Sequence, residues 1–102
     1  MKKQDLGDGW HLVTFTWTGG KAHSVRVHGD FNEWHGDELR DPVPEGDPAL
    51  ALRLQDGRYE FMYCLDGEIW VNDPTADEYV DNPYGGQNSV LHLPGDRASL
   101  EG

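Results

Sequence analysis

The chain has 102 residues, about the length of one domain, which provides for one hydrophobic core but not for a deep, lidded active site. Its 8 basic and 19 acidic residues give a formal net charge of −11, which disfavours nucleic acid and anionic membrane as partners because both are bound mainly through Lys and Arg. The chain has no apolar run of membrane-spanning length, no signal-like stretch at residues 1–5 and a lone cysteine, Cys64. We therefore expect a soluble cytoplasmic protein with an inert thiol.

Short alternating segments between clusters of Gly, Asp and Pro predict an all-β protein. The expected strands cover, in chain order, residues 10–17, 22–29, 50–54, 58–65, 68–72 and 87–93. Alternation predicts which side chains of the first four strands face the core: Val13, Phe15, Trp17, Val25, Val27, Leu50, Leu52, Leu54, Tyr59, Phe61, Tyr63 and Leu65. The outward-facing set of the second strand is His23, Arg26 and His28. Two antiparallel sheets packed as a β-sandwich are the most economical arrangement of these strands.

The connections are predicted from their turn residues. Asp56-Gly57 is a strong hairpin signal between the third and fourth expected strands, and Gly19-Gly20 and Asp66-Gly67 predict tight turns. Residues 30–48 are acidic and contain several prolines, so they are expected to form a long solvated surface connection, whereas residues 73–83 are expected to be irregular.

We expect a single domain over residues 1–102. Its core spans about residues 10–93, and residues 1–9 and 94–102 are expected to be tails.

Metal binding and catalysis have weak support. The histidines match no compact ligand motif, and Asp73, Asp77 and Asp81, although they recur every four residues, lack the glycine and terminal glutamate of the common calcium loop. We therefore expect the histidines to face solvent from strands, the three aspartates to have turn and capping roles, and no metal or cofactor. A small sandwich also offers no obvious walled pocket for paired carboxylates, so no enzyme is expected.

Sugar binding has more specific support. Trp34 lies in a polar loop and Trp70 follows a tight turn, and neither fits the alternating core pattern. An indole ring can stack on the apolar C–H face of a hexose while amides and carboxylates bind its hydroxyl groups. Composition alone leaves open whether these rings form a ligand platform or seal the edges of the sandwich.

Several short motifs occur in one order and at consistent spacing. They are residues 13–17, 29–34 (Gly-Asp-Phe-Asn-Glu-Trp), 57–61 (Gly-Arg-Tyr-Glu-Phe), 65–67 (Leu-Asp-Gly), Trp70, 72–74 (Asn-Asp-Pro) and 88–90 (Asn-Ser-Val). This ordered set resembles carbohydrate-binding module family 48. The family includes the N-terminal early-set domains of isoamylases and glycogen branching enzymes, and the glycogen-binding domain of the AMP-activated protein kinase β-subunit. The resemblance covers about residues 10–93 and implies an immunoglobulin-like early-set sandwich.

The resemblance also implies site residues. In the kinase branch, glycogen is bound through two tryptophans, a lysine, an apolar residue and an asparagine. By motif, these positions fall on Trp34, Trp70, Met62, Tyr84 and Asn88. Met62 stands where the family has lysine, which removes a donor to a sugar hydroxyl but leaves a thioether that can pack on a ring. The alternation of residues 58–65 independently directs Met62 away from the core.

The resemblance supports two functions. The first is non-catalytic binding of α-glucan, namely glycogen, starch or maltooligosaccharides. The second is a protein-interaction module that docks onto a glycogen- or starch-metabolising enzyme and has little sugar affinity, because some enzyme relatives use the domain chiefly for packing. We favour the first.

Overall fold

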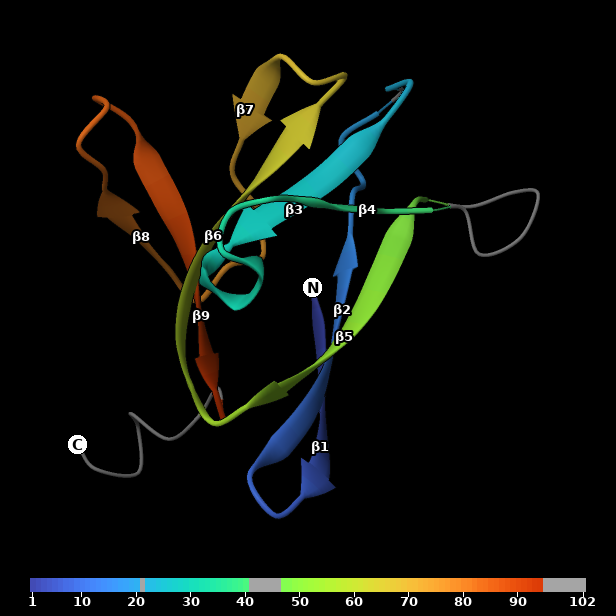
Figure 1. Cartoon of the computed structure of the whole chain (residues 1–102), viewed down its shortest axis with the longest axis vertical. Helices are drawn as coiled ribbons and strands as arrows, with labels where there is room; N and C mark the ends of the chain where they lie inside the picture. The colour runs from blue at the N-terminus through green and yellow to red at the C-terminus, as the bar shows by residue number, and fades with distance from the viewer. Residues whose placement is uncertain (21, 41–46, 95–102) are drawn as a thin grey trace.

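The computed structural model describes residues 1–20, 22–40 and 47–94, which form two packed antiparallel sheets (Figure 1). The elements are β1 (Lys2–Gly7), β2 (Trp10–Thr16), β3 (Val25–Gly29), the 3-10 turn η1 (Asp30–Asn32), β4 (Asp37–Glu38), β5 (Ala49–Gln55), β6 (Gly57–Leu65), β7 (Ile69–Val71), β8 (Glu78–Asp81) and β9 (Gln87–Leu93). One sheet has the order β1-β2-β5 and the other β4-β3-β6-β9-β8, with β7 also paired to β6. The predicted two-sheet antiparallel sandwich is confirmed.

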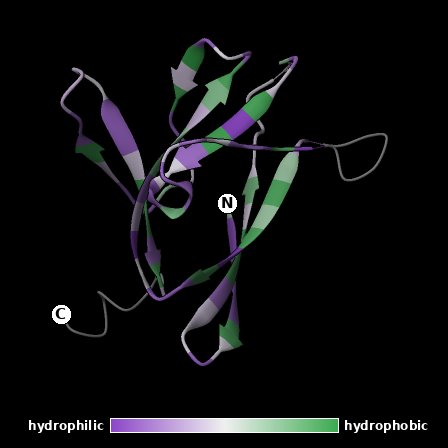
Figure 2. Cartoon of the chain, viewed as in Figure 1, coloured by the Kyte–Doolittle hydropathy of each residue, from purple (hydrophilic) through white to green (hydrophobic). Residues whose placement is uncertain are grey.

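The core lies between β2 and the central strands of the larger sheet. Hydrophobic and hydrophilic residues alternate along strands such as β3 (Figure 2), and because side chains alternate along a strand, the hydrophobic side chains of β2, β3 and β6 face the core. The predicted inward set is confirmed: its buried members are Val13, Phe15, Trp17, Val25, Val27, Leu54, Phe61 and Tyr63, and its partly buried members are Leu50, Leu52, Tyr59 and Leu65. Phe15 and Phe61 meet edge to face across the sandwich with ring centroids 5.3 Å apart. Each such buried aromatic stabilises the fold by about 1.5–3 kcal/mol.

A buried polar cluster around Asp73 fastens the segment after β7 to the core. The Asp73 carboxylate accepts hydrogen bonds from the Tyr63 hydroxyl (2.9 Å) and the Thr75 backbone N–H (2.8 Å). The Ser89 hydroxyl accepts the Asp73 N–H at 2.9 Å. Burial, and then the charge of Asp73, raise the pKa of Tyr63 far above its usual range, so this hydroxyl remains a donor. The expected capping role of Asp73 is confirmed.

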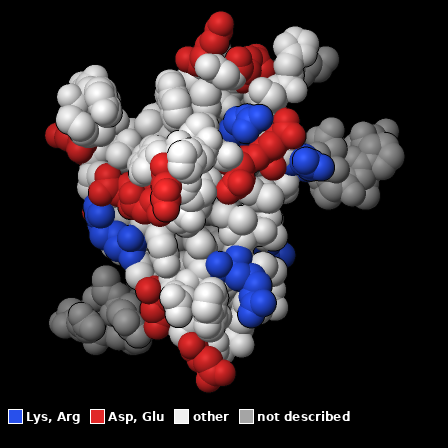
Figure 3. Space-filling model, viewed as in Figure 1, with Lys and Arg blue, Asp and Glu red and all other residues white. Residues whose placement is uncertain are grey.

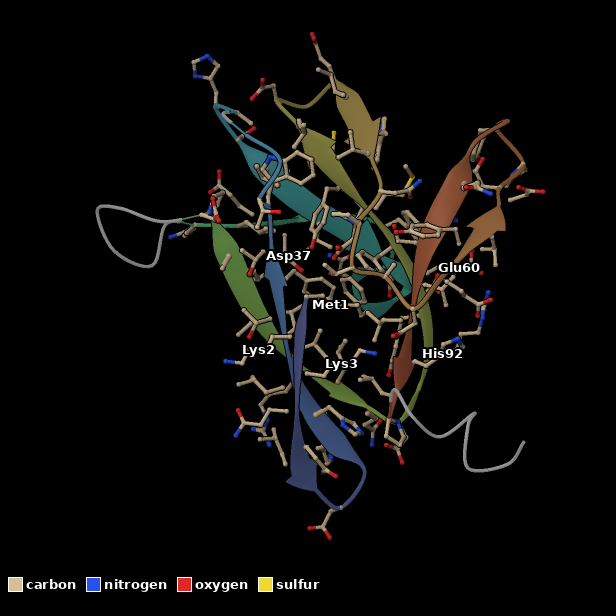
Figure 4. The ribbon with its side chains drawn as sticks, turned by 180° about the vertical axis from the view of Figure 1, so that it is seen from behind. Met1, Lys2, Lys3, Asp37, Glu60 and His92 are labelled. Atoms are coloured by element: carbon tan, nitrogen blue, oxygen red, sulfur yellow. The ribbon has the colours of Figure 1, made fainter. Side chains whose placement is uncertain are left out.

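The first residues of the chain are not the expected tail, because Lys2–Gly7 forms β1 and pairs with β2. Lys3 extends from β1 to the other sheet, where its ammonium group donates to the His92 carbonyl at 3.2 Å and to the Asp77 carboxylate (Figure 4). The sequence of β1, Lys-Lys-Gln-Asp-Leu-Gly, shows no apolar alternation, and backbone pairing with β2 holds the strand in place. Of the expected C-terminal tail, residues 95–102 lie outside the described part of the chain.

The predicted hairpin at Asp56-Gly57 is wrong. β5 pairs with β2, whereas β6 pairs with strands of the larger sheet, so the chain crosses between sheets at this point. His11 Nε2 and Asp56 Oδ1 lie 2.6 Å apart and fasten this corner to β2. The Asp66-Gly67 turn between β6 and β7 is confirmed.

Two segments expected to lack strands are also more ordered than predicted. The stretch at 73–83 contains β8, which pairs with β9. The acidic connection at 30–48 contains η1, β4 and the buried side chain of Leu39, while its residues 41–46 lie outside the described part. Conversely, the second expected strand begins at Val25 rather than at residue 22. The described residues include no helix long and apolar enough to cross a membrane.

Candidate functional site

The larger sheet forks at Met62. On one edge of β6, the pairing with β9 extends as far as Phe61, which lies opposite Ser89, and the pairing with β7 starts at Tyr63, which lies opposite Val71. Met62 therefore lies where β7 and β9 diverge, and on its other edge it pairs with His28 of β3. The fork leaves a hollow between β7 and the β8–β9 loop on the outer face of this sheet (Figure 3).

Trp34 is held on the rim of this hollow by the loop that follows η1. Its indole Nε1–H donates to Asp30 Oδ1 at 3.0 Å, and its backbone N–H donates to the Gly29 carbonyl at 2.9 Å. The second carboxylate oxygen of Asp30 accepts the Glu60 N–H at 2.8 Å, which ties the loop to β6. Glu33 and Trp34 both adopt the left-handed region, with φ of 55° and 62°, so the chain reverses sharply here.

His28 connects the two tryptophans. Its Nδ1–H donates to the Trp34 carbonyl at 2.7 Å, and its ring meets the Trp70 ring edge to face with centroids 4.7 Å apart. His28 is thus half-buried rather than simply outward-facing. Gly36, at a φ of +91°, lies against this imidazole, because a Cβ atom there would come within 2.5 Å of the ring. Glycine is therefore required here both for the positive φ and for the close approach of the His28 ring.

Tyr84 projects from the β8–β9 loop on the other side of the hollow. The side-chain oxygen of Asn82 accepts the Tyr84 N–H (2.9 Å) and the Gly86 N–H (3.1 Å), and so closes this loop. The Tyr84 side chain itself is 93% exposed, whereas Trp70 is 50% exposed and Trp34 is half-buried.

A row of polar side chains forms one wall. Asn82 Nδ2 donates to Asn88 Oδ1 at 3.1 Å, Asn88 Nδ2 donates to Glu60 Oε1 at 3.0 Å, and Arg58 donates to the other Glu60 oxygen at 2.9 Å. The hydrogen bond from Asn88, and then that from Arg58, lower the pKa of Glu60. Glu60 is therefore an ionised acceptor at neutral pH.

The hollow has a volume of about 720 Å³. Its lining includes all the residues selected by motif: Trp34, Met62, Trp70, Tyr84 and Asn88. The two tryptophans thus border one hollow, a question that the sequence leaves open. Their role in binding stays a prediction.

Sequence reasoning missed five lining residues. They are Asp30, Glu60, Asn82, Pro83 and Gly86. Asp30 falls in the run interpreted as a solvated loop, and its partners at Trp34 and Glu60 identify it as a positioning residue. The signal available was the Gly-Asp-Phe-Asn-Glu-Trp motif itself.

Exposed aromatic rings beside amides and carboxylates match the two kinds of surface that a sugar presents. The rings can contact C–H faces, and the polar wall can bind hydroxyl groups. A metal site is not indicated: no group of three or more His, Cys, Asp or Glu side chains in the described residues could hold an ion. Cys64 is buried, and burial raises the pKa of its thiol, as expected for an inert cysteine.

A family model for the glycogen recognition site of AMP-activated protein kinase matches residues 11–97. The chain belongs to this family. The resemblance predicted from the ordered motifs is therefore confirmed.

Two plant proteins are similar to the chain. Protein FLOURY ENDOSPERM 6 of Oryza sativa subsp. japonica is 34% identical over 70 residues, which is 69% of this chain and 13% of that protein. Phosphoglucan phosphatase LSF1 of Arabidopsis thaliana is 29% identical over 96 residues, which is 88% of this chain and 15% of the relative. The chain thus spans a small part of either relative. Both relatives are chloroplastic, which contradicts the expected cytoplasmic location.

Proposed function

We propose that this protein is a non-catalytic module that binds α-glucan chains such as glycogen, starch or maltooligosaccharides. The observation that carries the proposal is the grouping of Trp34, Trp70 and Tyr84 around one hollow with a wall of hydrogen-bonding side chains. Membership of a glycogen-recognition family supports the ligand class. The relatives favour a plastid as the place where the module acts.

Binding follows from the shape and chemistry of the hollow. The rings of Trp34 and Trp70 stack on glucose units, and Tyr84 with Met62 extends the apolar contact. Asn88 and Glu60 exchange hydrogen bonds with sugar hydroxyls, since a hydroxyl both donates and accepts. The hollow is open and the contacts are few, so we expect dissociation constants from about micromolar to millimolar.

A non-catalytic role fits the arrangement of carboxylates. Glu60 is held ionised by its hydrogen bonds, and both Asp30 oxygens accept backbone or indole N–H groups. A glycosidase needs one carboxylic acid that stays protonated near its working pH. The environment of Glu60 therefore opposes the protonated form that such an acid needs.

The test is calorimetric titration with maltoheptaose of the wild type, Trp34→Ala and Trp70→Ala. Each substitution is expected to weaken binding at least about fivefold, which corresponds to about 1 kcal/mol for a desolvated aromatic contact. Trp10→Ala is the matched control, because Trp10 is 37% exposed but belongs to the other sheet. Unchanged affinity in both pocket variants would contradict this site.

Docking onto a larger enzyme of glucan metabolism is the second candidate. It is favoured by the relatives, of which the matching region forms only 13% and 15%. Absence of glucan binding by the wild type at millimolar sugar would support docking over glucan recognition.

A further inference from the structure

The hollow is acidic. Asp30 and Glu60 contribute carboxylates to it, and no Lys or Arg is among the described residues that line it. Figure 3 shows acidic side chains gathered on this face over η1 and β6. Arg58 does not offset this charge fully, because it approaches both Glu60 at 2.9 Å and Glu78 at 3.9 Å.

Three N–H groups near the hollow are already bonded within the protein. The only N–H group of the Trp34 indole is bound to Asp30, and each of Asn82 and Asn88 uses an amide N–H within the wall. The two carboxylates that line the hollow, Asp30 and Glu60, carry acceptor oxygens only. A sugar hydroxyl can donate to these oxygens, whereas a phosphate monoester at neutral pH offers three acceptor oxygens and a charge of about −1.5 to −2.

Met62 occupies the fork, where a cationic side chain would face the hollow directly. It pairs across β6 and β3 with His28, whose Nδ1–H is bound to the Trp34 carbonyl. A thioether offers no charge and no donor to a phosphate. The position best placed to attract an anion is therefore neutral.

We propose that this site discriminates against phosphorylated glucan and selects unphosphorylated segments, with Asp30 and Glu60 as the repelling groups and Met62 as the position that leaves the repulsion uncompensated. The inference rests on the proposed glucan-binding function. Repulsion of one phosphate by two carboxylates a few ångströms away in a solvated groove corresponds to roughly tenfold weaker binding at low salt.

The experiment compares one phosphorylated maltooligosaccharide with the same oligosaccharide after enzymatic removal of its phosphate, by calorimetry at 20 and 500 mM NaCl. The wild type is expected to bind the neutral form roughly tenfold more tightly at low salt, and this ratio should fall toward one at high salt because the charges are screened. Met62→Lys should lower or invert the ratio, and Glu60→Gln should lower it. Met62→Leu is the neutral control and should keep it.

The outcomes separate the two proposals. If the wild type binds both sugars equally, or the phosphorylated form more tightly, the discrimination is refuted while glucan binding stands. If it binds neither, the proposed function fails and the discrimination fails with it. A preference for the neutral sugar that is unaffected by salt and unchanged in Met62→Lys would also refute the electrostatic origin.

Discussion

Asp30 is expected to act on glucan binding through Trp34. Asp30→Ala removes the acceptor of the indole N–H at 3.0 Å and of the Glu60 N–H at 2.8 Å. The indole then gains rotational freedom that must be lost again on binding, at a cost of about 0.5–1.5 kcal/mol. Maltoheptaose affinity should therefore fall about two- to twelvefold. Asp30 is exposed, so the loss of unfolding free energy should be small, about 1 kcal/mol.

The assay is a double-mutant cycle with Trp34→Ala, measured by calorimetric titration with maltoheptaose. If Asp30 acts through the indole, Asp30→Ala should have little further effect in the Trp34→Ala background. Glu33→Gln is the control, since it removes a nearby exposed charge that makes only a 3.7 Å ion pair with His35. Wild-type affinity in Asp30→Ala, or full additivity of the two substitutions, would refute the positioning role.

Two further substitutions test the supports of the site and of the core. Gly36 has a positive φ, and a Cβ atom in Gly36→Ala would lie 2.5 Å from the His28 ring. The free energy of unfolding should therefore fall by about 1–3 kcal/mol, and the affinity for maltoheptaose should fall several-fold. Calorimetry that shows wild-type affinity would contradict the link through His28. Asp73→Ala leaves the buried Tyr63 hydroxyl and the Thr75 N–H without their acceptor, so urea denaturation should show a loss of about 3 kcal/mol, with a smaller loss for Asp73→Asn. A loss below about 0.5 kcal/mol for Asp73→Ala would argue against this network.

Much of the sandwich follows from local sequence because alternation reports burial directly. Val13 and Phe15 of β2, and Phe61 and Tyr63 of β6, occupy the core as the period of two predicts. The strands that were missed have no such signal. β1 is polar, and β8 is the four-residue Glu-Tyr-Val-Asp, held by pairing with β9. Their order depends on partners elsewhere in the chain.

The hairpin error at Asp56-Gly57 has a related cause. Turn residues predict that the chain bends, but they do not predict which strands pair on either side of the bend. β5 finds its partner in β2, with Phe15 opposite Leu50, and the apolar faces of β5 and β6 meet across the core rather than within one sheet. Sheet membership is thus decided by contacts between segments distant in sequence.

The candidate site likewise contains residues that the sequence predicts and contacts that it does not. The residues selected by motif lie together because the fork at Met62 brings β7 and the β8–β9 loop to the borders of one hollow. The hydrogen bonds that hold them could not be predicted from the sequence, since the partner of Asp30 at Glu60 is 30 residues away and that of Glu60 at Asn88 is 28 residues away. An acidic residue in a polar loop is usually solvated, and only the fold shows that Asp30 fixes an indole ring. A ligand site on an open sheet depends on such supports, because its aromatic rings must be held in place for binding.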